Sequence, residues 1–204
     1  MTTVVGLRRP RVGDPTVEVV LEGGERLVIH DRRLSEHGLM VGATLDAVAR
    51  AAVERAGAAD AAERRALRLI ARRPRSQIEL ARRLGEWGLA ADDAAGVLDR
   101  LAAMGLVDDG ALAAAVVSSR RASAYGRLRI ESDLDRLEVD PAAGASVAAT
   151  SAEAEVERAR LALDSRRIPD RGDPAAVRRA ATFLTRRGFD AETVATVLRL
   201  DIDG

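Results

Sequence analysis

The sequence predicts a mainly α-helical protein, in which tandem three-helix modules form an elongated curved array behind a small N-terminal β-hairpin unit. The first supporting observation is a repeat: Leu84, Leu134 and Leu184 fall fifty residues apart, and each opens a related stretch. A fixed period of this length is typical of stacked supersecondary units. The second observation is composition, because 47% hydrophobic but only 2% aromatic residues indicate cores of Ala, Leu, Val and Ile.

Two β-rich runs near the N-terminus predict the hairpin. They occupy residues 16–21 and 26–30 and flank Gly23 and Gly24. A Gly-Gly pair between two such runs is a strong hairpin signal, because glycine adopts the required positive φ angles without steric cost. A short helical turn is predicted at residues 33–37. These elements together form a small β-rich unit.

Helices follow the hairpin, and their predicted limits come from capping residues and glycines. The first helix is predicted to end at Gly57. Asp60 is predicted to be the N-cap of the second helix, which ends near Pro74. Ser76 and Glu79 form a capping box that begins the following helix. Further N-caps are predicted at Asp108 or Asp109, Asp140, Ser151, Asp173 and Asp190, with a linker at residues 169–173.

Glycines also mark where helices end within the repeat. Gly88 and Gly188 are predicted to be left-handed helix stops, and Glu138 takes their place in the middle copy. Large apolar side chains at helical spacing are expected to be buried. The predicted core includes Val48, Ile78, Leu80, Leu84, Trp87, Val97, Leu101, Met104, Leu134, Leu161, Leu163, Phe183, Leu184 and Phe189.

The predicted helices group in threes, which gives a leader and three modules. The leader covers residues 1–58, and the modules cover residues 59–107, 108–150 and 151–204. The helix at residues 142–150 is expected to be the weakest, because it is rich in Ala and contains Gly144.

The composition excludes several classes of site. Cys is absent, which excludes disulfides, thiolate zinc sites and Cys nucleophiles, and the absence of Lys excludes a Walker A loop. The two histidines, His30 and His37, have no metal-ligand or catalytic pattern around them. We therefore expect a protein that is not an enzyme and has neither a cofactor nor a metal. With no signal peptide or membrane span in the sequence, a monomer in the cytoplasm is the default expectation.

All 32 basic residues are Arg, and 32 Asp and Glu residues balance them. Zero net charge argues against a general nucleic-acid coat, but the charge is unevenly distributed. Residues 63–83 contain eight Arg but only two Glu, and residues 118–129 contain four Arg and no acid. The candidate partner-binding or DNA-binding residues are Arg72, Arg73, Arg120, Arg121, Arg127, Arg129, Arg186 and Arg187. Weaker candidates are the pairs Arg166-Arg167 and Arg178-Arg179.

The four Arg of residues 118–129 form the best candidate contact group. The alternative is a solvated face whose charges pair with Glu131 and Asp133. Tyr125 lies in the same stretch and either stacks on a base or a partner, or is a packed corner residue.

Four stretches resemble the RecX family of bacterial recombination regulators. They are Arg72-Arg73-Pro74-Arg75-Ser76 leading to Leu84 and Gly88-Leu89, the block from Arg100 to Asp109, Gly126-Arg127-Leu128-Arg129-Ile130, and Phe183-Leu184 leading to Gly188-Phe189. Their order and spacing carry the resemblance, which covers nearly the whole chain. The sequence departs from the family pattern at Gly110, Ala111 and Leu112, and at Glu138.

The resemblance implies a regulator that binds the RecA filament on single-stranded DNA. Relatives lie in the helical groove of the filament and restrain ATP hydrolysis, strand exchange and the co-protease activity of the SOS response. The main alternative is a DNA-binding transcriptional regulator, because each module also resembles a helix-turn-helix. A helical scaffold for another protein is a third possibility.

Overall fold

The computed structural model describes residues 1–166 and 173–199, which contain four strands and ten helices. The chain divides into two compact units. One consists of Met1–Arg73 and Leu80–Leu106, and the other of Pro74–Glu79 and the chain from Val107 onward. None of the helices in these described residues combines the length and the hydropathy that a bilayer span requires.

The N-terminal sheet has four antiparallel strands in the order β3-β2-β1-β4. The predicted hairpin is confirmed at both strands. Two further strands were not predicted: β1, which pairs with β2 and contains a register shift between Val4 and Gly6, and β4, which pairs with β1. The bounds are β1 Thr2–Arg8, β2 Thr16–Leu21, β3 Arg26–His30 and β4 Thr44–Leu45.

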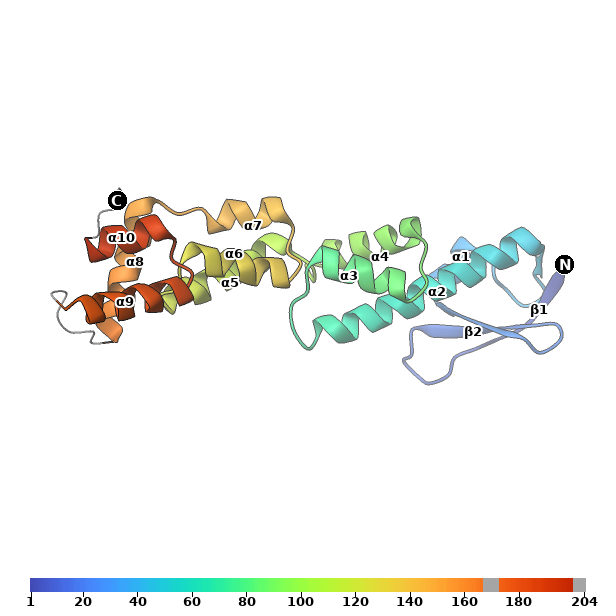
Figure 1. Cartoon of the computed structure of the whole chain (residues 1–204). Coiled ribbons are helices and arrows are strands. Elements are labelled where there is room, and N and C mark those ends of the chain that lie inside the picture. The colour runs from blue at the N-terminus through green and yellow to red at the C-terminus, as the bar shows by residue number, and fades with distance from the viewer. Residues whose placement is uncertain (167–172, 200–204) are drawn as a thin grey trace. The chain divides into compact units, whose positions relative to one another are not determined.

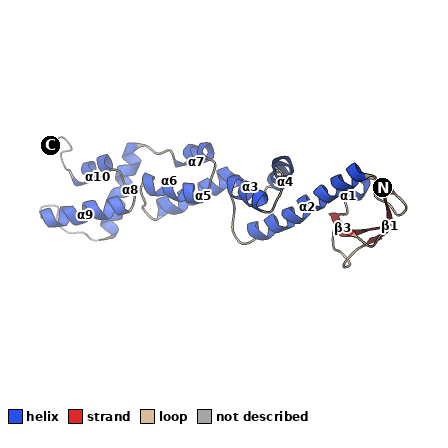
Figure 2. Ribbon diagram, turned by 45° about the vertical axis from the view of Figure 1, so that its right-hand side comes forward, coloured by secondary structure: helices blue, strands red, loops and turns tan. Residues whose placement is uncertain are grey.

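A buried aliphatic cluster joins this sheet to the first long helix. Val4, Val19, Leu21 and Ile29 are fully buried and pack with Val53 of that helix. This helix is α2, Ala47–Ile70, and Figure 2 shows the sheet beside its N-terminal part, where β3 and β4 contact it. The short helix α1, Arg33–Glu36, follows β3 as the sequence predicts.

The helix α2 is continuous from Ala47 to Ile70, so the predicted break at Gly57 and the predicted cap at Asp60 are wrong. Gly57 is needed for close approach, because a Cβ there would lie 2.6 Å from the carbonyl oxygen of Val28 in β3. Asp60 is buried in the middle of the helix, where its carboxylate accepts a hydrogen bond from the backbone N–H of His30.

The remaining helices repeat one pattern, a pair of helices joined by a left-handed turn. Gly88 and Gly188 have φ angles of 87° and 82°, which confirms both predicted stops. Glu138 adopts φ 53° in the middle copy, so a non-glycine residue takes the same conformation. The bounds are α3 Gln77–Glu86, α4 Ala91–Ala103, α5 Asp109–Ala122, α6 Arg127–Arg136, α7 Pro141–Ala148, α8 Ala152–Ser165, α9 Pro174–Arg186 and α10 Ala191–Leu198.

The repeated leucines are core residues. Leu84, Leu134 and Leu184 are at most 5% exposed, and Phe189 is buried beside Leu184. Figure 1 shows the helices of the second unit in two groups, α5–α7 and α8–α10. Each group encloses its own hydrophobic cluster. Trp87 and Phe183 are half-buried.

Four predicted core residues are exposed instead. Helical spacing identified a face correctly in most helices, but residues at the edges of that face lie beyond the packed neighbours. The exposed residues are Val48, Ile78, Met104 and Leu161.

The predicted caps mostly hold. Asp108, Asp140, Ser151, Asp173 and Asp190 each accept hydrogen bonds from backbone N–H groups in the first turn of a helix. Half of the capping box is present, because the Ser76 hydroxyl accepts from the Glu79 N–H while the Glu79 carboxylate pairs with Arg75. Of the predicted linker at residues 169–173, only Asp173 lies within the described residues.

Candidate anion-binding groove

The second unit contains a tight junction between the start of α6 and the turn that follows α9. The Gly126 N–H donates to the Arg187 carbonyl at 2.9 Å, and the Leu128 N–H donates to the Gly188 carbonyl at 3.0 Å. A Cβ at Gly126 would overlap the Gly188 carbonyl, and a Cβ at Gly188 would lie 2.5 Å from the Arg129 Cβ. The absence of side chains at both glycines therefore allows the two backbones to touch.

A carboxylate from a third helix completes this junction. Glu155, near the start of α8, accepts a hydrogen bond from the Arg127 N–H at 2.6 Å. This contact satisfies an N–H group at the start of α6 that has no partner within its own helix. The helix pair α5–α6 is thus joined to α8 and to the turn after α9 through main-chain groups and one buried carboxylate.

The same arrangement occurs fifty residues earlier, also within the second unit. The Gln77 N–H donates to the Asp109 carboxylate at 2.8 Å, and the Ser76 hydroxyl donates to the Leu137 carbonyl at 2.8 Å. Asp109 also accepts from the Asp140 N–H at 2.9 Å. The repeat thus includes the docking contacts as well as the helices.

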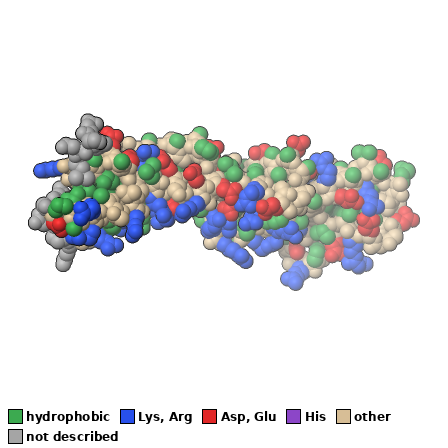
Figure 3. All heavy atoms as spheres, in the orientation of Figure 1, with side chains coloured by type: hydrophobic (Ala, Val, Ile, Leu, Met, Phe, Trp, Pro, Cys, Tyr) green, Lys and Arg blue, Asp and Glu red, His purple; other side chains and the backbone are tan. Residues whose placement is uncertain are grey.

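The junction forms one end of a basic groove, a hollow of about 780 Å³. One face of α9 lines it, with residues spaced three or four apart, and the opposite side comes from the α5–α6 turn and the end of α8. Arginine side chains gather along the α9 side of this unit in Figure 3. Among residues 1–166 and 173–199, the lining residues are Tyr125, Arg129, Arg166, Ala175, Arg178, Arg179, Thr182, Phe183, Arg186 and Arg187, none of which is acidic.

Aromatic rings orient several of these guanidinium groups. The Arg187 guanidinium lies 4.9 Å from the ring centroids of both Tyr125 and Phe183. It also donates to the Ser123 carbonyl at 2.6 Å. Arg129 lies 5.9 Å from the Tyr125 ring, and Arg166 lies 5.1 Å from the Phe183 ring. Cation–π contacts of this kind hold a guanidinium over a ring face and leave its in-plane N–H donors available.

Few carboxylates neutralise the groove. Arg129 pairs with Asp133 at 3.2 Å, and Arg179 with Asp173 at 3.6 Å. Within residues 1–166 and 173–199, no carboxylate lies within ion-pairing distance of the remaining groove arginines, which are Arg166, Arg178, Arg186 and Arg187. The groove therefore presents a net positive surface suited to an anionic ligand.

The structure separates the four arginines predicted from residues 118–129. Arg120 pairs with Asp133 at 2.6 Å and lies 5.4 Å from the Tyr125 ring, so it joins Arg129 beside the groove. Arg121 instead donates to the Ala149 carbonyl at the end of α7. The four arginines therefore do not share one surface, and the predicted pairing with Asp133 is confirmed for Arg120 and Arg129. Their role as contact residues stays a prediction.

Arg127 faces away from the groove. Its side chain pairs with Glu131 at 2.8 Å and reaches Asp190 at 3.5 Å. The hydrogen bond to Glu131 and the charge of that carboxylate raise the pKa of Arg127 above its ordinary value.

The other candidate residues fall into two groups. Arg186 and Arg187 line the groove, whereas Arg72 and Arg73 are exposed after α2 in the first unit. Arg166, Arg178 and Arg179, which were predicted as weaker contact candidates, also line the groove. Arg167 lies outside the described residues. For Arg178 and Arg179, the signal in the sequence is their spacing from Arg186 on one face of α9.

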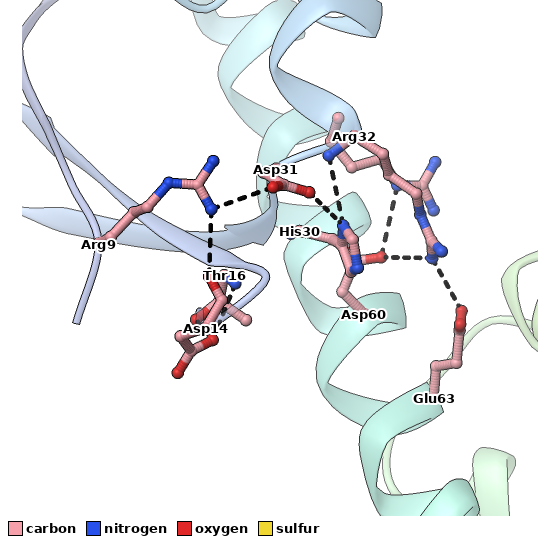
Figure 4. A network of polar contacts seen from close by, with 9 residues as sticks. Arg9, Asp14, Thr16, His30, Asp31, Arg32, Asp60 and Glu63 are labelled. Carbon is pink, nitrogen blue, oxygen red and sulfur yellow. Dashed lines mark hydrogen bonds and ion pairs between the residues drawn. The ribbon is translucent and has the colours of Figure 1, made fainter. Parts of the chain in front are cut away.

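The residues around His30 belong to a separate polar network in the first unit (Figure 4). The Asp60 carboxylate accepts from the His30 N–H at 2.7 Å and from the Arg32 guanidinium at 3.3 Å. Arg32 also bonds Glu63, which pairs with Arg100 of α4 at 2.8 Å. These contacts join β3, α2 and α4, and they give the network a structural role.

Comparisons with known proteins agree on one family. The model of the first three-helix domain of RecX matches residues 62–101. The chain is 39% identical over 141 residues to the protein named Regulatory protein RecX of Xanthomonas oryzae pv. oryzae, covering 68% of this chain and 86% of the relative. The protein of the same name from Herminiimonas arsenicoxydans is 31% identical over 135 residues, covering 66% of this chain and 89% of the relative.

Solved structures show the same fold. A crystal structure of regulatory protein RecX matches with a TM-score of 0.72 and 21% identity, covering 97% of this chain and 98% of that one. The RecX structure from Lactobacillus salivarius matches with a TM-score of 0.57 and 15% identity, covering 70% of this chain and 95% of that one.

Proposed function

Because this chain belongs to the RecX family of regulatory proteins, we propose that it regulates a RecA-type recombinase by binding the filament that the recombinase forms on single-stranded DNA. Family membership is the observation that carries this proposal. The regulator is not an enzyme, and it acts in the cytoplasm as a monomer. It restrains ATP hydrolysis, strand exchange and the co-protease activity of the SOS response by lying in the groove of the filament.

The docked modules of the second unit support a binding role. The junction at Gly126 combines backbone hydrogen bonds with the Glu155 carboxylate, so the surfaces of α5–α7 and α8–α10 are held in a fixed relation. A rigid surface loses little conformational entropy when it binds. The candidate contacts are the basic groove, Arg120 beside it, and Arg72 and Arg73 in the first unit.

The rival function, sequence-specific DNA binding by helix-turn-helix modules, fits the third helices poorly. The commonest base-edge contacts of a recognition helix come from Arg, Lys, Asn or Gln side chains. The helices α7 and α10 contain none of these residues. The helix α4 has one, Arg100, and its side chain is bonded to Glu63.

A filament-binding assay tests the proposal. RecA filaments would be assembled on single-stranded DNA with a non-hydrolysable ATP analogue, sedimented with the full chain, and compared with a short duplex of random sequence. We expect retention on the filaments and slower ATP hydrolysis when ATP is supplied. Equal retention on free duplex with no effect on ATP hydrolysis would instead support the transcription-factor alternative.

A further inference from the structure

The helices α3, α6 and α9 occupy the same position in the fifty-residue repeat, so residues at matching positions can be compared directly. On α3, Arg82 pairs with Glu86 one turn later, at 2.6 Å. The matching residues on α9 are Thr182 and Arg186, a neutral hydroxyl and a cation. The last copy of the repeat therefore has a charge of opposite sign at the second position and no charge to pair with it at the first.

Thr182 lies in the middle of the basic face of α9. Arg178 and Arg179 precede it by four and three residues, and Arg186 follows it by four, so all three arginines lie on its side of the helix. Thr182 is exposed and lines the basic groove. Its hydroxyl donates to the Arg178 carbonyl at 2.9 Å, which is a common bond for a threonine inside a helix. The hydroxyl is thus accessible, and three arginines lie one helical turn from it.

These arginines lack the acids that neutralise the other two helices. On α3 and α6, arginines of the surface pair with acids of the same helix, whereas α9 contains no acid. Among the described residues, Arg178 and Arg186 have no carboxylate partner. Arg179 pairs with Asp173, which precedes the helix, at 3.6 Å. The face around Thr182 therefore has an excess of positive charge that a dianion at this position would balance.

A phosphate ester on Thr182 would find three partners within one turn. Phosphothreonine carries a charge of about −1.5 to −2 at pH 7 and three acceptor oxygens, and arginine binds phosphate through parallel N–H donors. Negative charge near the C-terminal end of a helix is ordinarily unfavourable because of the helix dipole. Three guanidinium groups outweigh that effect, because charge-assisted hydrogen bonds are stronger than the interaction with the dipole.

We propose that Thr182 is a phosphorylation site, and that its phosphate is held by Arg178, Arg179 and Arg186 and neutralises the basic groove. In this step the Thr182 oxygen attacks the γ-phosphorus of ATP on a protein kinase. Its proton passes to a base of the kinase, and the bond from the γ-phosphorus to the bridging oxygen breaks to release ADP. The arginines three and four residues before the acceptor suit a kinase that selects its substrates by basic charge.

This inference goes beyond the proposed function and rests on it only for the consequence of the modification. Because the groove is a candidate contact, a neutralised groove should weaken retention of the chain on the recombinase filament. The modification would thus regulate the regulator.

Thr185 provides a matched control in the same helix. It is exposed as Thr182 is, but no charged residue lies three or four positions from it, where the chain has Ala181, Thr182, Gly188 and Phe189. Phosphothreonine at position 185 would therefore add the same charge to α9 without an arginine one turn away.

Phosphorus NMR of the full chain, with phosphothreonine incorporated at position 182 or at position 185, tests whether the arginines hold the phosphate. The second pKa of the phosphate, ordinarily about 6, should be about one pH unit lower at position 182, because guanidinium groups favour the dianion. Arg178→Gln/Arg186→Gln should remove this difference. Arg136→Gln/Arg160→Gln, which changes exposed arginines elsewhere in the same unit, should keep it.

A kinase assay tests the site itself. The unmodified full chain would be incubated with ATP and a protein kinase that selects arginine before the acceptor, and the phosphate would be located by mass spectrometry. We expect Thr182 to be modified roughly tenfold faster than Thr185, and Arg178→Gln/Arg179→Gln to remove that preference.

Two results would overturn the inference. One is a phosphate with the same pKa at positions 182 and 185, with circular dichroism showing both chains to be folded. The other is modification of Thr182 no faster than that of Thr185.

Sedimentation with recombinase filaments separates the two proposals. If the unmodified chain is not retained, the proposed function is wrong while the pKa difference between the two positions still stands. If the unmodified chain is retained and phosphothreonine at position 182 weakens retention no more than at position 185, the regulatory consequence is wrong while the proposed function stands.

Discussion

Individual glycines in this chain serve different physical purposes, although they look alike in the sequence. Gly88 needs a positive φ angle, and a Cβ there would meet nothing within 4 Å. Gly188 has the same conformation, but a Cβ there would also collide with the backbone of Arg129. The loss in the free energy of unfolding on replacing each glycine should therefore differ, even though both glycines end a helix of the repeat.

Gly188→Ala should lower the free energy of unfolding of the second unit by about 3 kcal/mol, because backbone strain and overpacking add. Gly88→Ala should cost only about 1 kcal/mol, since strain acts alone. Gly85→Ala serves as a control inside α3, where a better helix former should stabilise by up to about 1 kcal/mol. Urea denaturation measures all three. Equal losses at positions 88 and 188 would contradict a tight junction.

Both glycine stops can be predicted from the sequence, because a left-handed turn is a local property. It could not distinguish their surroundings, since the collision at Gly188 involves a residue 59 positions earlier in the chain (188 − 129). Asp60 was misread for the same reason. An aspartate before an apolar helical stretch resembles an N-cap, but only the tertiary structure places a β-strand N–H beside it.

At the scale of elements, buried carboxylates connect one helix to the start of another. Asp109 is 6% exposed and accepts from two backbone N–H groups, those of Gln77 and Asp140. Its neighbour Asp108 is the N-cap of α5 and accepts from the Ala111 N–H. The sequence left open which of these residues is the cap, and the structure assigns the cap to Asp108 and a docking role to Asp109.

Asp109→Ala should destabilise the second unit by about 3 kcal/mol, because two backbone N–H groups would lose a buried, charged acceptor. Asp108→Ala is the matched control, with an expected loss of about 1 kcal/mol for an exposed cap. Chemical denaturation followed by circular dichroism gives both values. If the two variants lost the same stability, Asp109 would be no more than a second cap.

The cap of α10 should make stability depend on pH. Asp190 accepts from the Thr193 N–H at 2.8 Å, and this hydrogen bond holds the pKa of Asp190 below its ordinary value of 3.8. A carboxyl with a depressed folded pKa binds fewer protons when folded. Its contribution to the free energy of unfolding is therefore fully present above the ordinary pKa and lost as the pH falls through the lower folded value.

The variant Asp190→Asn tests this dependence, because the amide oxygen still accepts the Thr193 N–H while the charge is removed. The difference in unfolding free energy between wild type and variant should be constant near neutral pH and shrink as the pH falls from about 5 to about 3. Denaturation curves across that range measure it. A difference that does not change with pH would mean that the carboxylate charge stabilises nothing there.

Element boundaries were well predicted where caps and glycines determine them, as in the β2–β3 hairpin and the start of α9. The basic groove was predicted only in part. The arginine-rich stretch at residues 118–129 stands out in the sequence, but its members point in three directions. The groove instead depends on the spacing along α9, which brings arginines separated in sequence onto one face.

At the scale of the whole molecule, the two units have their own buried networks. In the first unit, Asp60 and Glu63 connect β3, α2 and α4 through Arg32 and Arg100. In the second, Asp109 and Glu155 cap helix starts. The fifty-residue repeat predicted the helices of both units, but it gave no sign that the hairpin and α2 share a network, because the hairpin lies outside the repeat.

Because each unit has its own buried polar network, we expect a substitution in one network to destabilise only that unit. Asp60→Ala should destabilise the first unit by about 3 kcal/mol, because the His30 N–H and two guanidinium groups lose a buried partner. Hydrogen exchange should accelerate in β3, α2 and α4, while the amides of α8 and α10 keep their wild-type rates. Glu54→Ala removes an exposed carboxylate from the same helix and should leave both units unchanged. Equal acceleration in α8 and α10 would show that the chain unfolds as one cooperative body, and the two compact units would then share a single stability.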